Sequence, residues 1–396
     1  MEIFDEKHPL IEPQPGPLAD AVRKRNIPLL SLSSRKTPVV VQMGYGYKQK
    51  RRVASDVNDS AGAFLCLQKD VAKELLDRCG FPVPKGFSEE DKEEFLKKLP
   101  HLDYPIVIKP SDSIWGIGVT TNINNAEAAA QAFQLAKKTS PTIIAEEFVP
   151  GNDYRVLIIN DKFIAAMHRA PARVFGNGQD TVEELVLKEN KKRKKALANN
   201  PYSLKPIKID QNTRQLLSST GKDLDHIPEL KEEVQLKMNS NIKSGGEGID
   251  VTNEICSENK NLIRRAAQVM ALDIAGFDIQ AERIDKPITE TGGKIIEVNS
   301  NPDIFMHLFP SNGDPIDAPG ILIDYLFPDP EDAWIDIELD GKVCRDEKFI
   351  NAHLADVPKL VTRLVSTDSK ETKDYTGKQN LLSYLLDKLT VKIKIN

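Results

Sequence analysis

The residues from 292 to 302 have the clearest potential for chemistry. Their sequence is Gly-Gly-Lys-Ile-Ile-Glu-Val-Asn-Ser-Asn-Pro, which brings the carboxylate of Glu297 and the amide oxygen of Asn299 into an apolar-rich run. Positions i and i+2 of a strand point to the same face. Asp278, in Ala-Gly-Phe-Asp-Ile, could add a third oxygen from a neighbouring strand. Such oxygens suit Mg²⁺, which is usually shared with substrate phosphates; a solvated strand face is the competing interpretation.

A lysine followed by a glycine-containing loop forms a second candidate site. Lys109 ends the β-like run 104–109, and the loop after it contains Ser111, Gly116 and Gly118. The ammonium group supplies charge to a phosphate, while glycines let backbone N–H groups approach its oxygens. This is not a Walker A loop, because no Gly-Lys-Ser/Thr follows. A solvated lysine at a strand end is the competing interpretation.

A third candidate segment runs from Glu146 to Asp153. Adenine binding needs backbone hydrogen bonds and apolar walls. A strand with Glu146, Glu147 and Val149 that leaves the core and turns at Pro-Gly could supply both. Asp153 could then accept hydrogen bonds from ribose hydroxyls. A charged strand end followed by a turn is the alternative.

Length and composition restrict the class of protein. A chain of 396 residues with 40% hydrophobic residues can form two or three domains. Its net charge of −5 argues against a general nucleic-acid binder. No apolar run reaches the roughly 18 residues of a membrane span, and the N-terminus lacks a signal-peptide core. The widely spaced cysteines form no disulfide framework. We therefore expect a cytoplasmic location, small-molecule partners, and no nucleic-acid or membrane partner.

The hydrophobic pattern predicts which elements position these residues. Strands are expected near residues 38–41, 104–109, 142–149, 154–159, 163–168, 274–281 and 294–298. Helices are expected over 61–79, from Ser88 onward, and over 125–138, most of 182–240, 258–272 and 320–327. We expect a Pro-rich lead-in over 1–45, a domain over 46–329 with a helical insertion at about 182–240, and an extension of unknown role over 330–396.

The order of these motifs along the chain resembles the order found in the ATP-grasp superfamily. Within that superfamily, the motifs are most similar to the central ATP-grasp module of the cyanophycin synthetases. The order is Lys69 on the first helix, a lysine ending a strand, a glycine loop, an acidic hinge strand, and finally Asp and Glu-x-Asn. The matching segments are 49–51, 68–73, 80–86, 151–155, 208–210, 241–246, 250–252, 296–299 and 306–311. The resemblance implies an α+β fold with the nucleotide between two lobes, and a small mobile phosphate-loop subdomain.

The resemblance also implies ligands for ATP and Mg²⁺. The residues that would contact ATP phosphates, adenine or ribose are Lys69, Lys109, Ser111, Gly116, Gly118, Glu146, Glu147, Val149 and Asp153. The residues that would hold Mg²⁺ are Asp278, Glu297 and Asn299. By the same resemblance Arg155 and Arg169 are the catalytic candidates, acting on γ-phosphate and acyl-phosphate oxygens, with structural ion pairs as the alternative. The candidate substrate contacts are Ser244, Gly245, Gly246 and His307, although a lone histidine can instead be structural.

The implied activity is ATP-dependent ligation of a carboxylate to an amine through an acyl phosphate, with an amino acid or small peptide as substrate. Two alternatives stay open: a non-catalytic nucleotide-binding relative or partner-dependent subunit, and a glutathione-synthetase-like ligase. The sequence names neither the amino acids joined nor the oligomeric state, for which a homo-oligomer is one option.

The chain departs from the family pattern at several positions. Gln68 stands where the family has Asp, and Trp115-Gly-Ile-Gly stands where it has His-Gly-Arg-Gly. Asn-Ser-Asn-Pro-Asp at 299–303 replaces Asn-Ala-x-Pro-Gly, and no Mur-ligase-like nucleotide loop follows Pro328. We therefore expect a small amide product rather than a long cyanophycin polymer.

Overall fold

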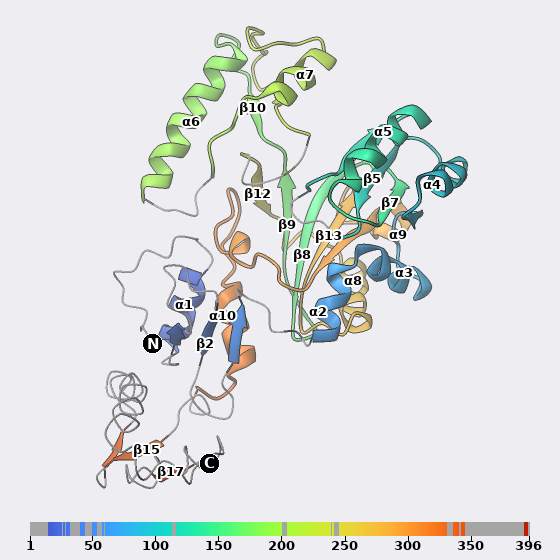
Figure 1. The fold of residues 1–396 in the computed structure, drawn as a ribbon. Coiled ribbons are helices and arrows are strands. Elements are labelled where there is room, and N and C mark those ends of the chain that lie inside the picture. The colour runs from blue at the N-terminus through green and yellow to red at the C-terminus, as the bar shows by residue number, and fades with distance from the viewer. Residues whose placement is uncertain are drawn as a thin grey trace, which may run out of the picture. The chain divides into compact units, whose positions relative to one another are not determined.

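The structure, a computed structural model, divides into two compact units (Figure 1). One comprises residues 56–318, and the other combines residues 1–55 with 319–396. The structure describes residues 15–25, 27, 29–31, 40–43, 50–53, 58, 60–112, 116–199, 204–238, 240, 245–330, 336–339, 342–344 and 392–394. Much of 1–45 and 330–396 lies outside these ranges, and the predicted domain boundaries stay predictions.

An antiparallel sheet with the strand order β12-β9-β8-β13-β14 forms the larger lobe of the 56–318 unit. Its strands are β8 (Asn152–Ile159), β9 (Lys162–Ala170), β12 (Glu247–Asp250), β13 (Ile274–Ala281) and β14 (Lys294–Asn299). Helix α8 (Ser257–Val269) packs on β8, β9 and β13, while α2 (Ser60–Leu67) and α3 (Lys69–Arg78) pack on β14. Burial of these apolar faces is the main stabilising term.

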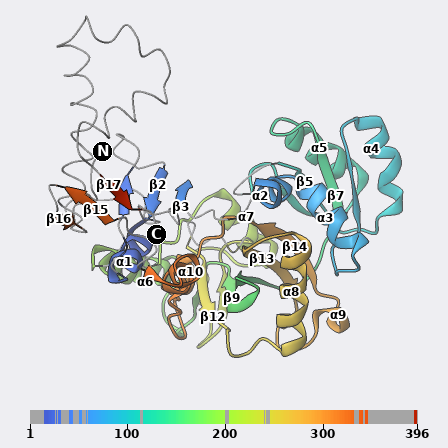
Figure 2. The same cartoon turned by 90° about the horizontal axis from the view of Figure 1, so that it is seen from below.

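A four-stranded antiparallel sheet with the order β4-β7-β5-β6 forms the smaller lobe. Its strands are β4 (Gly86–Glu89), β5 (Ile106–Pro110), β6 (Thr120–Ile123) and β7 (Ile143–Glu147). Helices α4 (Lys92–Lys98) and α5 (Ala126–Lys137) cover it (Figure 2) and bury Phe95 and Phe133, whose ring centroids are 4.6 Å apart. Asn125 caps α5, because its side chain accepts from the N–H of Ala128 at 2.8 Å.

The insertion has a core of its own, formed with a two-stranded sheet. It contains α6 (Val182–Asn199) and α7 (Gln211–Ser219), and β10 (Arg173–Phe175) pairs antiparallel with β11 (Glu233–Gln235). Buried members of the core include Val174, Val182, Leu217, Val234 and Leu236. The prediction of a mostly helical segment was therefore wrong for its last part, because β11 is a strand whose partner lies some sixty residues earlier in the chain.

The other unit contains two three-stranded antiparallel sheets, β1-β2-β3 and β16-β15-β17. The strands are β1 (Leu29–Ser31), β2 (Val40–Met43), β3 (Lys50–Val53), β15 (Asp336–Leu339), β16 (Lys342–Cys344) and β17 (Lys392–Lys394). Helix α1 (Pro15–Lys24) precedes them, and α10 (Ala318–Leu326) leads into the second sheet. Arg25 Nη2 donates to Asp324 Oδ2 at 2.8 Å. None of the described helices is long and apolar enough to cross a membrane.

The α+β prediction is confirmed, and most predicted elements are present. The predicted helix at Ser88 is wrong: Ser88 pairs with Ile144 in the β4–β7 ladder. Helix α4 begins later because Asp91 caps it, accepting from the N–H groups of Glu93 at 2.8 Å and Glu94 at 3.0 Å. The predicted helix over 61–79 is interrupted at Gln68, which separates α2 from α3.

Candidate active site

Charged side chains from four strands form a row across one face of the five-stranded sheet. Asp278 on β13 lies opposite Glu297 on β14 and opposite Arg155 on β8. Asp153 on β8 lies opposite Arg169 on β9. The alternate positions of the same strands belong to the hydrophobic core that includes residues of α8, so the charged row occupies the opposite face.

A β-bulge in β14 turns Glu297 toward this row. Asp278 pairs with Glu297 but Ile279 pairs with Ile295, so Ile296 is an extra residue in the ladder. The extra residue lets Ile295 and Val298 both join the core while Glu297 faces the other way. Sequence alternation predicted that Glu297 and Asn299 share a face, but it did not predict the bulge that sets which face.

Two arginines hold Asp278. Arg155 Nε lies 2.5 Å from Asp278 Oδ1, and Arg169 Nη2 lies 3.0 Å from Asp278 Oδ2. Arg169 also contacts Asp153 Oδ1 at 2.6 Å. Burial raises the pKa of Asp278, but Arg155 and Arg169 together bring it below its ordinary value. Asp278 is therefore an ionised carboxylate whose charge is shared between two guanidinium groups.

His307 is buried beside this row, and its imidazole makes no hydrogen bond to the described residues. It lies in the 3₁₀ helix η3 (Phe305–His307), which contacts β9 and β12. Neither ring nitrogen has a partner among the described residues. Burial, and then the nearby Arg155 and Arg169, lower the pKa of His307 to about 3. The imidazole is therefore neutral near pH 7, with one nitrogen able to donate and the other able to accept.

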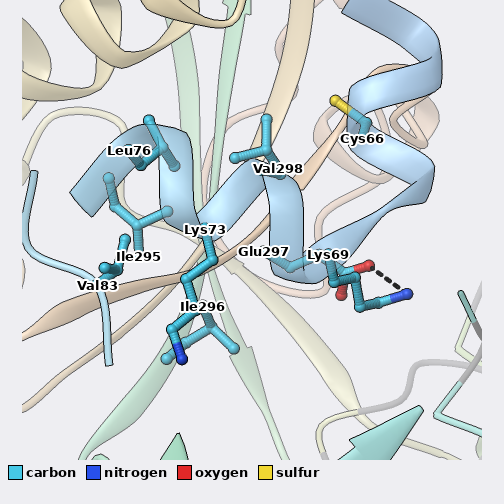
Figure 3. Close-up of a pocket in the computed structure, with 10 residues that line it drawn as sticks. Cys66, Lys69, Lys73, Leu76, Val83, Ile295, Ile296, Glu297 and Val298 are labelled. Carbon is cyan, nitrogen blue, oxygen red and sulfur yellow. Dashed lines mark ion pairs between the residues drawn. The ribbon is translucent and has the colours of Figure 1, made fainter. Parts of the chain in front are cut away.

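Lys69 and Lys73, one turn apart on α3, approach two different carboxylates. Lys69 Nζ lies 3.6 Å from Glu297 Oε1 at a small hollow between α3 and β14 (Figure 3). Lys73 Nζ instead lies 3.1 Å from Glu146 Oε2 on β7. Sequence reasoning did not select Lys73 as a site residue, although its i+4 spacing from Lys69 is a usable signal.

Glu146 joins Lys73 to Lys109 in the smaller lobe. Lys109 Nζ lies 2.5 Å from Glu146 Oε1. Burial raises the pKa of Glu146, but Lys109 and then Lys73 hold it below its ordinary value. Burial lowers the pKa of Lys73 despite this partner. The Glu146 carboxylate is thus occupied by two ammonium groups in this structure.

The neighbouring hinge and loop residues make both backbone and side-chain contacts. The Lys85 N–H donates to Glu147 Oε1 at 3.0 Å, and Val149 is buried. Ser111 donates its hydroxyl to Asp70, and the Lys69 N–H donates to the Ser111 carbonyl at 3.2 Å. The phosphate-loop candidate therefore begins against the N-terminus of α3.

The remaining candidates lie around this cluster. Gly116 and Gly118 both have positive φ, and residues 113–115 between the loop ends lie outside the described part. Gly245 and Gly246 are buried just before β12, and Ser244 lies outside the described residues. Asn299 Nδ2 faces the Gly276 carbonyl at 3.5 Å.

The donor set on β13 and β14 fits Mg²⁺ in chemistry. Two carboxylates and one amide oxygen on a shared face are the hard oxygen ligands that this ion takes, with phosphates and water completing its shell. No cluster of three or more His, Cys, Asp and Glu side chains suited to a metal occurs in the part of the chain that the structure describes.

Comparison with known proteins identifies relatives of this fold. A model of the RimK-like ATP-grasp domain matches residues 67–193. Cyanophycin synthetase from Nostoc sp. is 36% identical over 329 residues, covering 81% of this chain and 36% of that protein. The glutathione biosynthesis bifunctional protein GshAB from Desulfotalea psychrophila is 34% identical over 250 residues, covering 62% of this chain and 32% of that protein.

A solved structure of another protein has a similar fold. The crystal structure of a bifunctional glutathione synthetase from Pasteurella multocida has a TM-score of 0.58 at 27% identity, covering 78% of this chain and 43% of that one. The chain spans about a third of the length of the curated relatives it matches. Together these similarities show that the chain has the ATP-grasp fold.

Proposed function

We propose that this chain is an ATP-dependent ligase that joins a carboxylate to an amine through an acyl phosphate. The supporting observation is the juxtaposition of Asp278, Glu297 and Arg155 in register across three strands, with Lys69 reaching Glu297. Phosphoryl transfer is catalysed mainly by positioning and by compensation of negative charge. This arrangement provides oxygen ligands and fixed cations on one surface.

ATP would bind between α3 and the two sheets. Lys69 and Lys109 would contact its phosphates, and the loop through Ser111, Gly116 and Gly118 would cover them with backbone N–H groups. Lys73 adds charge near the same place through its contact with Glu146. Glu146, Glu147 and Val149 would line the adenine and Asp153 would accept from the ribose.

Asp278, Glu297 and Asn299 would hold Mg²⁺. When bound, the ion neutralises charge on the transferring phosphate and its neighbour. In the present structure Asp278 already binds Arg155 and Arg169. With Asp278 engaged in this way, Arg155 and Arg169 would turn part of their guanidinium N–H groups to substrate oxygens.

The reaction would occur in two steps. A substrate carboxylate oxygen attacks the γ-phosphorus of ATP, forming an O–P bond as ADP leaves. The amine then attacks the acyl carbon, the C–O bond breaks, inorganic phosphate leaves, and the amine proton passes to a base or to water. Arg155 and Arg169 would stabilise the anionic oxygens with their planar donors. His307, buried beside them, would offer a neutral hydrogen bond to the same substrate group.

The substrate class we propose is an amino acid or small peptide. The support comes from relatives named as cyanophycin synthetase and as a glutathione biosynthesis protein. A glutathione-synthetase-like ligase is the second candidate, supported by the structural similarity to the bifunctional glutathione synthetase. Pocket contacts decide between such substrates, and few changes are needed to alter the choice.

A phosphate-release screen tests the proposal. The purified chain is incubated with ATP and Mg²⁺ against single amino acids, short peptides, the precursors of glutathione, and aspartate and arginine with a short cyanophycin primer. Products are identified by mass spectrometry. We expect substrate-dependent phosphate release with an amide product of matching mass. Nucleotide binding without any stimulated release would instead support the non-catalytic alternative.

A further inference from the structure

The insertion holds a buried arginine that reaches the glycine turn before β12. Arg193 on α6 has a side chain only 2% exposed. Its Nη1 donates to the Gly245 carbonyl at 2.7 Å and to the Lys205 carbonyl at 3.1 Å, and its Nη2 donates to Glu247 Oε1 at 3.0 Å. Only its Nε contact, to Glu189 Oε1 at 2.8 Å, stays within α6.

The turn that Arg193 holds has little freedom to move. Gly245 has a φ of +100°, a backbone conformation that other L-residues rarely adopt, and a Cβ there would lie 2.9 Å from Ile207 Cα. Ile207 is itself fixed to α6, because its N–H donates to Asn190 Oδ1 at 2.7 Å. Contacts from the insertion therefore define the position of Gly245.

Glu247 extends this anchor into the main sheet. It lies in β12, opposite Ala170 of β9, and Arg169 is the next residue of β9. Arg173 Nε also approaches Glu247 Oε2 at 3.6 Å. A single half-buried carboxylate thus receives one arginine from the insertion and one from β10, close in the chain to the proposed catalytic row.

We propose that Arg193 is a positioning residue for the Gly245–Gly246 turn and thereby sets the affinity for the substrate that the turn binds, but not for ATP. This inference rests on the proposed function and on the prediction that Gly245 and Gly246 contact the substrate. The planar guanidinium group of Arg193 donates to two carbonyls and a carboxylate at once. A lysine cannot reproduce this set of contacts, because its ammonium group is a compact point charge. The insertion then acts as part of the substrate site through its buried face.

The test uses Arg193→Lys, which keeps a positive charge next to Glu247 but loses the planar guanidinium group and its several N–H donors. The substrate is the one that the phosphate-release screen identifies. Loss of one or two hydrogen bonds predicts a rise in its KM of about threefold to thirtyfold. The dissociation constant of Mg²⁺-ATP, measured by calorimetry, should stay unchanged. Hydrogen exchange at the amides of residues 245–247 should be faster in the variant.

A matched control and a double-mutant cycle separate positioning from general destabilisation. Glu189→Gln removes the charge of the Arg193 partner within α6 but keeps an accepting oxygen, and it should leave KM unchanged. Gly245→Ala displaces the turn directly, so its effect on KM and that of Arg193→Lys should be less than additive in the double variant. Additive effects, or an unchanged KM in a folded Arg193→Lys variant, would overturn the inference.

Hydrogen exchange keeps this inference separate from the proposed function. If the wild-type chain releases no phosphate with any substrate, the proposed function fails by itself. Unchanged exchange at residues 245–247 in Arg193→Lys would then also reject the positioning role. If Arg193→Lys does not fold, Glu247→Gln removes the carboxylate end of the same contact and is measured in its place, with the same expected rise in KM and the same overturning result.

Discussion

Two carboxylates with little exposed surface organise the candidate site, and each is shared by two cations. Asp278 contacts Arg155 and Arg169, while Glu146 contacts Lys73 and Lys109. A buried charge is tolerated only when it is paired. Removing Glu146 would therefore leave Lys73 and Lys109 without this partner, whereas removal of Asp278 would strand Arg155 but leave Arg169 paired with Asp153. These pairings also hold the cations on the face where the phosphates are expected.

Glu297 is the carboxylate whose loss should affect chemistry most selectively. We expect Glu297→Gln to reduce phosphate release by more than about 100-fold, the upper range for loss of an outer-shell metal partner, because an amide brings no charge to the metal. Circular dichroism should be unchanged, since Glu297 is partly exposed. Glu290→Gln, at an exposed position, is the control. Near-normal turnover in Glu297→Gln would remove it from the site.

The buried imidazole of His307 should make the stability of the folded chain depend on pH. Its pKa is about 3 in the folded chain and about 6.5 when exposed. Between these values the unfolded chain binds a proton that the folded chain does not. The contribution of His307 to the free energy of unfolding is therefore complete above about pH 6.5. It falls by about 1.4 kcal/mol per pH unit as the pH drops toward 3.

Urea unfolding of wild type and His307→Gln between pH 7 and 4.5 measures this contribution. The free energy of unfolding should fall less steeply in the variant, while His101→Gln at an exposed position should follow the wild type. An imidazole resonance of His307 that titrates near pH 6.5 would contradict the prediction.

At the scale of elements, the sequence predicted long periodic segments well and short paired segments poorly. Strand β13 occupies the predicted residues 274–281, and Asn125 caps α5 as expected. The stretch from Ser88 to Asp91 offers two candidate N-caps, and local sequence does not choose between them. Ser88 pairs with β7, a strand that lies far away in the sequence, and this pairing leaves Asp91 as the N-cap of α4.

Helix α7 provides a test of such a local signal. Asp210 caps it, accepting from the Thr213 N–H at 3.0 Å, and its other oxygen lies 2.5 Å from Nζ of the buried Lys237. Asp210→Ala should destabilise by about 1 kcal/mol for the cap plus about 1–3 kcal/mol for the stranded Lys237. Asp210→Asn should lose only the second contribution, because asparagine also caps.

Urea unfolding at pH 7 measures both variants, and Lys237→Met in the Asp210→Asn background should recover stability. The pH dependence has a definite sign. The hydrogen bond from Lys237 lowers the pKa of Asp210 to about 2, so this stabilisation is present above about pH 4 and is lost as the pH falls toward 2. Equal stability of the alanine and asparagine variants would argue against the cap.

At the scale of the molecule, the candidate site combines residues from two sheets and a helix. Sequence spacing could relate Glu297 to Asn299 because they share a strand. It could not show that Arg155 and Arg169 both hold Asp278, since that contact depends on the register of three strands. Lys73 was missed for the same reason: its partner Glu146 lies in the other lobe.

Nucleotide binding should therefore stabilise the unit formed by residues 56–318 as a whole. A ligand at 100 times its dissociation constant adds about 2.7 kcal/mol to the free energy of unfolding, which corresponds to a rise in melting temperature of roughly 5–10 °C for a domain of this size. Differential scanning calorimetry with Mg²⁺ and a non-hydrolysable ATP analogue measures the shift.

Variants and metal removal assign that shift to the site. Chelation of Mg²⁺ should reduce it, because the oxygens of Asp278 and Glu297 repel phosphates when no cation lies between them. Lys109→Met should reduce it as well, whereas Lys97→Met, at an exposed residue paired with Glu94, should not. An unshifted melting temperature at millimolar Mg²⁺ and analogue would mean that the cations gathered around Glu146 and Glu297 do not form a nucleotide site, and the proposed ligase activity would fail with it.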